Sequence, residues 1–196
     1  MRRILLSAIA AAWLCAAPSA SATTYAIDKD HSTVSFKIRH LFSKVQGTFG
    51  DFAGTFDYDP GQPAQWHAEA TIQAASINTN TPKRDEHLRS ADFFDVAKHP
   101  AIIFKSTEIT DATEAGAKLH GVLTMHGVEK PVTLELAIHG AGKDPWGNLR
   151  SGFTATTKLN RTEFGIIWNK ALETGDVLLG DDVEITLEIE GIVKAQ

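Results

Sequence analysis

Apolar and polar residues alternate with a period of two along most of the chain. The clearest run is 183–190, where four aliphatic residues alternate with three glutamates and one threonine. A period of two is typical of a β-strand with one buried face. Comparable runs lie at 34–39, 45–49, 52–56, 66–73, 101–110, 119–126, 132–139 and 153–159.

Turn-forming residues separate these runs. Gly50 and Asp51 predict a kink between two of them, and Gly127 is expected to begin a hairpin turn. Loops are expected at 57–63, 140–147 and 172–180, and a short helical turn at 161–165.

This spacing predicts an all-β fold of about eight strands, mostly neighbours in sequence. No helical pattern exceeds about ten residues, which excludes parallel βαβ units. An up-and-down antiparallel β-barrel fits the order best, and a two-sheet sandwich is the alternative. Alternation is the same in both folds, so the pattern alone does not separate them.

One stretch, 81–95, breaks the alternation and predicts a short helix around 82–90 followed by a tight turn. Thr81 suits the N-cap and Pro82 the first helical position. Asp85 lies in the first turn, where an acidic group favours the helix dipole. Leu88 is the one strongly apolar residue of this helix. We therefore expect the helix to cross an opening or an edge of the β framework.

The barrel interior is either filled by side chains or hollow enough for a small ligand. Small residues on the predicted apolar faces favour a cavity, but they would also make room for large phenylalanines opposite them. These small residues are Gly54, Ala68, Ala70, Gly121 and Ala155.

The first 22 residues have the pattern of a signal peptide. Arg2 and Arg3 precede a short apolar run, and Ala20-Ser21-Ala22 matches a small-residue cleavage site. The predicted mature domain is 23–196, and the periplasm is the expected compartment. The one cysteine, Cys15, lies in the leader, so no disulfide is expected after cleavage.

Charge and side-chain chemistry exclude several classes of function. The formal charge is −5 and becomes −7 without Arg2 and Arg3, which disfavours nucleic acid and anionic membrane surfaces as partners. No membrane span is expected. The eight histidines show no tight zinc-type spacing, so no metal is expected. No nucleophile elbow or phosphate-binding glycine loop is present, so we expect no catalytic residues.

Seven ordered motifs span the predicted mature chain. They are Tyr25-x-Ile27-Asp28-x-x-His31-Ser32-x-Val34-x-Phe36, Gly47-x-Phe49-x-x-Phe52-x-Gly54, Ser76-Ile77-x-Thr79, Arg84-Asp85-x-His87-Leu88-x-Ser90-x-Asp92-Phe93-Phe94-Asp95, His99-Pro100-x-Ile102-x-Phe104-x-Ser106-Thr107, Gly121-x-Leu123-Thr124-x-His126-Gly127-Val128-x-Lys130-Pro131-Val132 and Asn160-Arg161-x-x-Phe164-Gly165. In this order they resemble the YceI family of exported bacterial proteins. Glu129 replaces a threonine of the family pattern, a change that suits a surface position.

The resemblance implies a lipocalin-like barrel that binds a polyisoprenoid or similar amphiphilic lipid. It implies no established catalytic activity and no cofactor other than the bound lipid. Stress-response and envelope roles, transport or storage of the lipid, and a homodimer are compatible with it.

Two sets of residues are the candidate ligand contacts. The lumen is expected to be lined by Phe36, Ile38, Phe49, Phe56, Ile72, Ile103, Leu123, Leu134, Phe153 and Ile185. The candidate head-group contacts are Arg84, His87, Arg89 and Arg161. Arginine suits such a role through its planar fork of donors. Arg84 could instead pair with Asp85, Asp92 or Asp95 and pin the helix to the barrel rim, and Arg161 has the same ambiguity beside Glu163.

Two rival hypotheses remain open at this point. One is an enzyme acting on such a lipid or its head group, with His87 as acid–base and Asp85 orienting it. The other is a structural envelope protein with a filled core.

Overall fold

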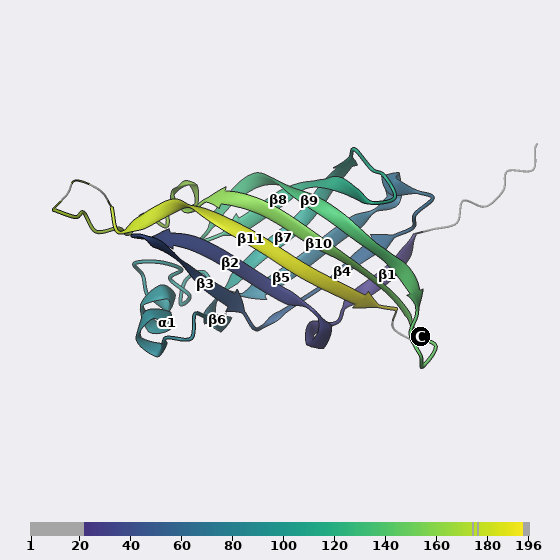
Figure 1. The fold of residues 1–196 in the computed structure, drawn as a ribbon, viewed down its shortest axis with the longest axis horizontal. Helices are drawn as coiled ribbons and strands as arrows, with labels where there is room; N and C mark the ends of the chain where they lie inside the picture. Colours follow the sequence, from purple (N-terminus) through teal and green to yellow (C-terminus); the bar gives the residue numbers. More distant parts are fainter. Residues whose placement is uncertain (1–21, 174, 176, 194–196) are drawn as a thin grey trace, which may run out of the picture.

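The computed structural model describes residues 22–173, 175 and 177–193, which form a β-barrel with one short α-helix (Figure 1). The strands are β1 Thr23–Ile27, β2 Thr33–His40, β3 Ser43–Phe49, β4 Phe52–Tyr58, β5 His67–Gln73, β6 Ile77–Asn78, β7 Ala101–Thr110, β8 Gly116–Met125, β9 Val128–Lys143, β10 Leu149–Asn160 and β11 Leu179–Ile192. The helices are α1 Pro82–Arg89 and the 3-10 turns η1 Lys29–His31, η2 Pro63–Gln65, η3 Ala74–Ser76 and η4 Arg161–Phe164. The predicted leader lies almost entirely outside the described residues.

The first six strands combine in pairs into three long, bent strands. β1 and β2 both pair antiparallel with β11, so together they make one broken strand. β3 pairs with β2 and β4 with β1, which makes the second. β5 pairs with β4 and β6 with β3, which makes the third. With β7 to β11, this gives eight strands in sequence order.

Each of these eight strands pairs antiparallel with its neighbours in sequence, and β11 closes the circle on β1 and β2. The predicted up-and-down barrel is therefore confirmed. One sheet closed on itself excludes the sandwich alternative.

The three bends lie side by side across the sheet. The Gly50 amide donates to the Ser76 carbonyl at 3.2 Å, and the Gln73 amide donates to the Asp51 carbonyl at 2.8 Å. Lys29 on the first strand pairs with the Asp51 carboxylate at 2.8 Å. The predicted kink at Gly50 and Asp51 is thus one part of a bend shared by three strands.

Beyond this bend the sheet divides. β7 lies along β5, whereas β6 pairs with β3. Residues 79–100 leave the sheet between β6 and β7 and carry α1 to one end of the barrel (Figure 1). We call this the α1 end. The opposite end, which carries residues 144–148 and the end of β11, is the far end. The position of α1 confirms the expectation that the helix crosses an opening.

The hairpin between β8 and β9 has a two-residue turn. His126 and Gly127 have φ of 53° and 75°, as expected for a tight turn matched to the strand twist. The turn therefore begins one residue before the predicted Gly127. A Cβ on Gly127 would lie 2.7 Å from Cε1 of His99, so close packing also requires glycine.

The loop predicted at 140–147 is shorter in the structure. β9 continues to Lys143, and its register with β10 shifts between Gly152 and Phe153. Gly140 has φ of 108°, so glycine here allows an irregularity inside the ladder rather than the end of a strand. Only 144–148 connect the two strands.

Aromatic packing closes the far end of the barrel interior. Tyr25 and Phe56 stack with centroids 5.1 Å apart, and Phe153 meets Phe56 edge to face, also at 5.1 Å. Ile189 packs in the same cluster. Among the described residues, no helix is long and apolar enough to cross a membrane.

Candidate ligand-binding cavity

The barrel interior holds a cavity of about 350 Å³ lined almost entirely by apolar side chains. It runs from Phe56 and Phe153 of the far-end cluster toward α1. His40, Arg84, His87, Trp168 and Leu178, all partly exposed, line its other end, which we call the mouth. A cavity of this volume contradicts the filled-core alternative.

Nine of the ten predicted lumen residues line this cavity. They are Phe36, Ile38, Phe49, Phe56, Ile72, Leu123, Leu134, Phe153 and Ile185. Their contact with a ligand stays a prediction.

Ile103 is the exception, and the prediction that it lines the lumen is wrong. Its neighbours Ile102 and Phe104 line the cavity instead. Ile103 pairs with Thr71 and Thr124, on the opposite face of the sheet. β7 begins with four apolar residues in a row, so its alternation does not show which face points inward.

The small inward residues serve both of the purposes left open by the sequence. Ala68 and Ala70 line the cavity and widen it. Gly121 makes room for a phenylalanine, because a Cβ there would lie 2.5 Å from the Phe104 ring. Gly47 does the same for Phe36 at 2.4 Å. Both rings line the cavity, and their present positions require glycine at 47 and 121.

Several lining residues between η4 and the first residue of β11 were not predicted from the sequence. Ile166, Trp168, Leu178 and Leu179 from this region all border the cavity. The available signal was the group of apolar residues at 166–168 directly after the predicted helical turn. Without a strand or helix period, the sequence does not show which of these side chains point into the barrel.

Arg84 borders the mouth, but much of its guanidinium already has partners. Its Nε donates to Thr79 Oγ1 at 2.7 Å, and its Nη2 donates to the Thr79 carbonyl at 2.8 Å and to Thr81 Oγ1 at 3.1 Å. Thr81 occupies the N-cap position of α1, yet its side chain makes no capping bond and instead accepts this bond from Arg84. The predicted N-cap position of Thr81 is therefore confirmed, although its side chain does not supply the capping bond.

Arg89 and Arg161 donate mainly to backbone carbonyls, although Arg161 also borders the cavity. Arg89 donates to the carbonyls of Ala75 and Ile77 at 2.7 Å each, and it does not line the cavity. Arg161 is 4 % exposed and donates to several acceptors. These are the carbonyls of Ile166 at 2.7 Å, Trp168 at 2.9 Å and Gly180 at 3.0 Å, and the Asp181 carboxylate at 3.0 Å. Burial lowers the Arg161 pKa, and Asp181 opposes that shift. Arg161 is therefore a structural donor, but its acidic partner is Asp181 and not the neighbouring Glu163.

His87 faces the cavity mouth within an aromatic cluster. Its ring meets Phe93 at 5.0 Å and Trp168 at 5.1 Å, both edge to face. Its Nε2 lies 2.8 Å from Asp92 Oδ2. Phe93 and Phe94 also line the cavity and belong to the apolar core under α1.

Asp85 does not orient His87, so that part of the enzyme hypothesis is wrong. The Asp85 carboxylate, 6 % exposed, accepts from the Thr79 amide at 2.8 Å and from Thr79 Oγ1 at 2.5 Å. Burial alone would raise the Asp85 pKa, but these hydrogen bonds and the nearby Arg89 and Arg84 lower it overall. Asp85 is therefore an ionised structural group that fixes the start of α1.

At the far end, Asp28, His31 and Glu190 bring potential metal-ligand atoms within 4.8 Å of one another. A protein cation already lies between the carboxylates. Arg150 Nη1 lies 2.7 Å from Asp28 and 2.5 Å from Glu190, and its Nε lies 2.9 Å from Asp144. The Asp28 side chain also accepts from the Asp30 amide at 3.2 Å, which makes an Asx-type turn. This network has a structural explanation that requires no metal.

Comparison with known proteins gives the family context of this cavity. Residues 25–191 match the family model described as YceI-like domain. A UPF0312 protein of Shewanella baltica is 38 % identical over 197 residues, which cover 99 % of this chain and all of that protein.

Solved structures share the fold. The YCEI protein of Campylobacter jejuni has 32 % identity and a TM-score of 0.69, covering 81 % of this chain and 91 % of that one. A polyisoprenoid binding domain from Saccharophagus degradans has a TM-score of 0.65 at 14 % identity, covering 87 % and 98 %. At that identity the second likeness shows the fold alone.

Proposed function

The chain belongs to the YceI-like domain family, and from that premise we propose that it holds a polyisoprenoid or similar long-chain amphiphile inside its barrel. The observation that carries the proposal is the apolar cavity of about 350 Å³, which runs from the far-end aromatic cluster to the mouth. A structural relative from Saccharophagus degradans is described as a polyisoprenoid binding domain, which supports this class of ligand.

Burial of a hydrocarbon tail supplies enough free energy for such binding. Each buried methylene contributes roughly 0.8 kcal/mol, so about ten carbons give on the order of 8 kcal/mol. That corresponds to a dissociation constant of about one micromolar before the cost of ordering the chain is subtracted. Few polar contacts are needed.

The polar groups at the mouth would orient the head of the ligand. Of the four candidates, His87 and Arg84 border the cavity at the mouth. Arg161 also borders it, but four protein acceptors already surround its guanidinium. We assign the head group to the neighbourhood of His87 and Arg84.

The N-terminal pattern supports export to the periplasm, with cleavage before Thr23. A lipid carrier in that compartment would serve transport, storage or a stress response. N-terminal sequencing of the protein from a periplasmic fraction tests the compartment, and a chain that keeps residues 1–22 would contradict it.

Ala70→Phe is expected to weaken ligand binding. Ala70 lines the cavity, so a phenyl ring there occupies space needed by the tail. Excluding two methylenes would weaken binding about tenfold. The measurement is a titration with an isoprenoid quinone added from ethanol, and the readout is the quenching of tryptophan fluorescence. Trp168 lines the cavity and serves as an internal reporter.

Thr71→Phe is the matched control, because it introduces the same ring one residue further along β5. Thr71 pairs with Ile103 on the outer face of the sheet. It should bind like the unsubstituted protein. Equal binding by both variants, or no saturable quenching in any of them, would rule out the cavity as the ligand site.

A further inference from the structure

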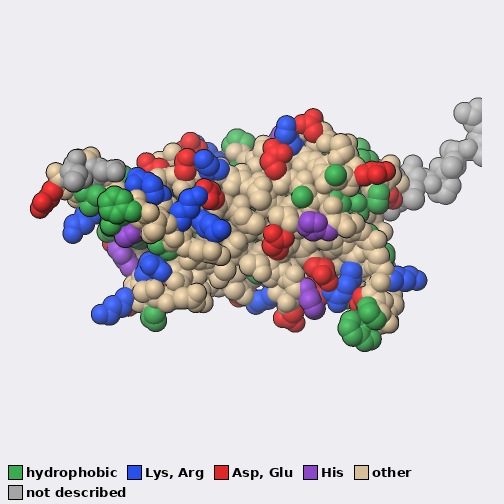
Figure 2. Space-filling view, in the orientation of Figure 1, with side chains coloured by type: hydrophobic (Ala, Val, Ile, Leu, Met, Phe, Trp, Pro, Cys, Tyr) green, Lys and Arg blue, Asp and Glu red, His purple; other side chains and the backbone are tan. Residues whose placement is uncertain are grey.

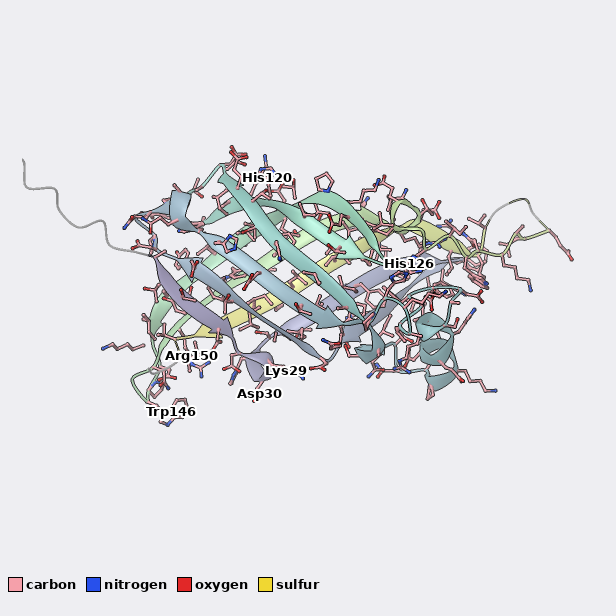
Figure 3. All side chains as sticks on the ribbon, turned by 180° about the vertical axis from the view of Figure 1, so that it is seen from behind. Lys29, Asp30, His120, His126, Trp146 and Arg150 are labelled. Atoms are coloured by element: carbon pink, nitrogen blue, oxygen red, sulfur yellow. The ribbon has the colours of Figure 1, made fainter. Side chains whose placement is uncertain are left out.

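Two large apolar side chains at the α1 end project into solvent. Phe42 is 102 % exposed and Ile167 is 72 % exposed. Among the described residues, one other large apolar side chain is comparably exposed, Trp146 at 82 %. Trp146 lies at the far end, opposite α1 (Figure 3). Single exposed apolar residues are common on protein surfaces, so the meaning of these two depends on where they lie.

Phe42 and Ile167 stand beside the mouth of the cavity. Phe42 lies two residues after His40, and Ile167 lies between Ile166 and Trp168, and these three neighbours line the cavity. The two segments are joined through Leu178. The Leu41 amide donates to the Leu178 carbonyl at 3.0 Å, and the Leu178 amide donates to the Lys170 carbonyl at 3.0 Å.

The turn that presents Phe42 has an unfavourable backbone conformation. Leu41 has φ of 50°, a region that bulky residues rarely adopt. Such strain costs on the order of 1 kcal/mol or more and persists where the surroundings enforce it. Here the result is a hairpin tip that directs a phenylalanine away from the barrel, where it contributes nothing to the core.

Charge does not supply the attraction for such a surface. The chain carries a formal charge of −5, and in Figure 2 several Lys and Arg side chains lie toward the α1 end with Asp and Glu side chains beside them. A partner recognised by Phe42 and Ile167 is therefore an apolar one. The interfacial layer of a lipid bilayer accepts isolated aromatic and aliphatic side chains of this kind.

We propose that Phe42 and Ile167 insert into the surface of a phospholipid bilayer and place the cavity mouth against it. This inference rests on the proposed function and names the source of the amphiphile as the membrane itself. A long apolar tail would then pass between bilayer and barrel without crossing water, where each exposed methylene costs roughly 0.8 kcal/mol. The far end, closed by Tyr25, Phe56 and Phe153, would face away.

The test is sedimentation of the protein with phosphatidylcholine vesicles. The double variant Phe42→Ser, Ile167→Ser is expected to reduce the vesicle-bound fraction by about tenfold, because partial burial of both side chains accounts for a factor of this size. Trp146→Ser, which removes an equally exposed side chain at the far end, should partition like the unsubstituted protein. Raising the salt concentration should not release the protein, since charge does not hold it.

A second measurement separates this inference from the proposed function. The double variant should take up isoprenoid quinone added from ethanol with unchanged affinity, because neither residue lines the cavity. Its uptake of the same quinone from loaded vesicles should be slower. No vesicle binding by the unsubstituted protein, equal binding by the double variant, or loss of binding in Trp146→Ser would each overturn the membrane inference. Failure to take up quinone from ethanol would overturn the proposed function instead.

Discussion

At the scale of single residues, the arginines of this protein act mainly as structural donors. Arg161 and Arg89 donate to backbone carbonyls, and Arg150 joins three carboxylates at the far end. Those three carboxylates raise the pKa of Arg150. Hydrogen bonds from Asn148 and then Arg150 lower the pKa of Asp144 to about 2 from its ordinary 3.8. Bonds from Arg150 and His31 also lower the pKa of Asp28, although partial burial opposes them.

Arg150→Ala is expected to lower the melting temperature by several degrees at neutral pH. The substitution leaves Asp28, Asp144 and Glu190 close together without the cation that joins them. A carboxyl with a lowered pKa stabilises the fold above its ordinary pKa near 4, and that contribution disappears as the pH falls through the lowered value. The difference between variant and unsubstituted protein should therefore shrink between about pH 4 and pH 2.

Melting curves from pH 7 to pH 2 measure this. Lys158→Ala is the control, because that cation is 61 % exposed and lies 3.6 Å from its acidic neighbour. A constant difference between Arg150→Ala and the unsubstituted protein across the whole range would refute the assignment of the low pKa values to this network.

At the scale of elements, α1 is attached to the barrel by polar contacts as well as by its apolar side. Asp85 binds Thr79, and Arg89 binds the carbonyls of Ala75 and Ile77 next to β6. Leu88, Phe93 and Phe94 pack into the core beneath. The helix therefore holds one side of the mouth in place.

Asp85→Ala is expected to lower the free energy of unfolding by about 2–3 kcal/mol, because it leaves the buried Thr79 amide and hydroxyl without their acceptor. Residues 79–100 should also become more sensitive to limited proteolysis than the strands. Urea titration and mapped proteolytic fragments are the measurements. Glu86→Ala, an exposed acidic neighbour in the same helix, should change neither. Equal stability of both variants would mean that Asp85 does not anchor α1.

Sequence reasoning succeeded for elements whose residues carry a clear period or a clear boundary. Pro82 marks the start of α1, and strict alternation identifies β11. It failed where local signals conflict with long-range pairing. Gly140 reads as a loop, yet the ladder between β9 and β10 continues through it. β1 and β6 are short and are recognisable as strands only from their partners β4 and β3.

The candidate site shows the same limit. Period-two positions gave nine lining residues, because a barrel converts alternation directly into inside and outside. Ile103 failed because both faces of β7 begin apolar. The hydrogen-bond partners of the arginines are carbonyls distant in the sequence, such as Gly180 for Arg161. No local sequence pattern predicts those contacts.

At the scale of the whole molecule, eight antiparallel strands close a barrel that has two different ends. At the far end, stacked aromatic rings pack inside the barrel, and Arg150 joins three carboxylates that do not line the cavity. The α1 end carries the mouth, with Phe42 and Ile167 beside it. Between the ends, Gly47 and Gly121 make room for the rings of Phe36 and Phe104, which line the cavity. This difference between the two ends is what a container for one amphiphilic molecule requires.

The most direct measurement is organic extraction of the protein purified from its native host, followed by mass spectrometry of the extract. We expect a long-chain amphiphile in close to equimolar amount, released together with unfolding and much reduced in Ala70→Phe. An extract without lipid, from a protein that also fails to take up added isoprenoid quinone, would contradict the central claim that the barrel is a lipid container.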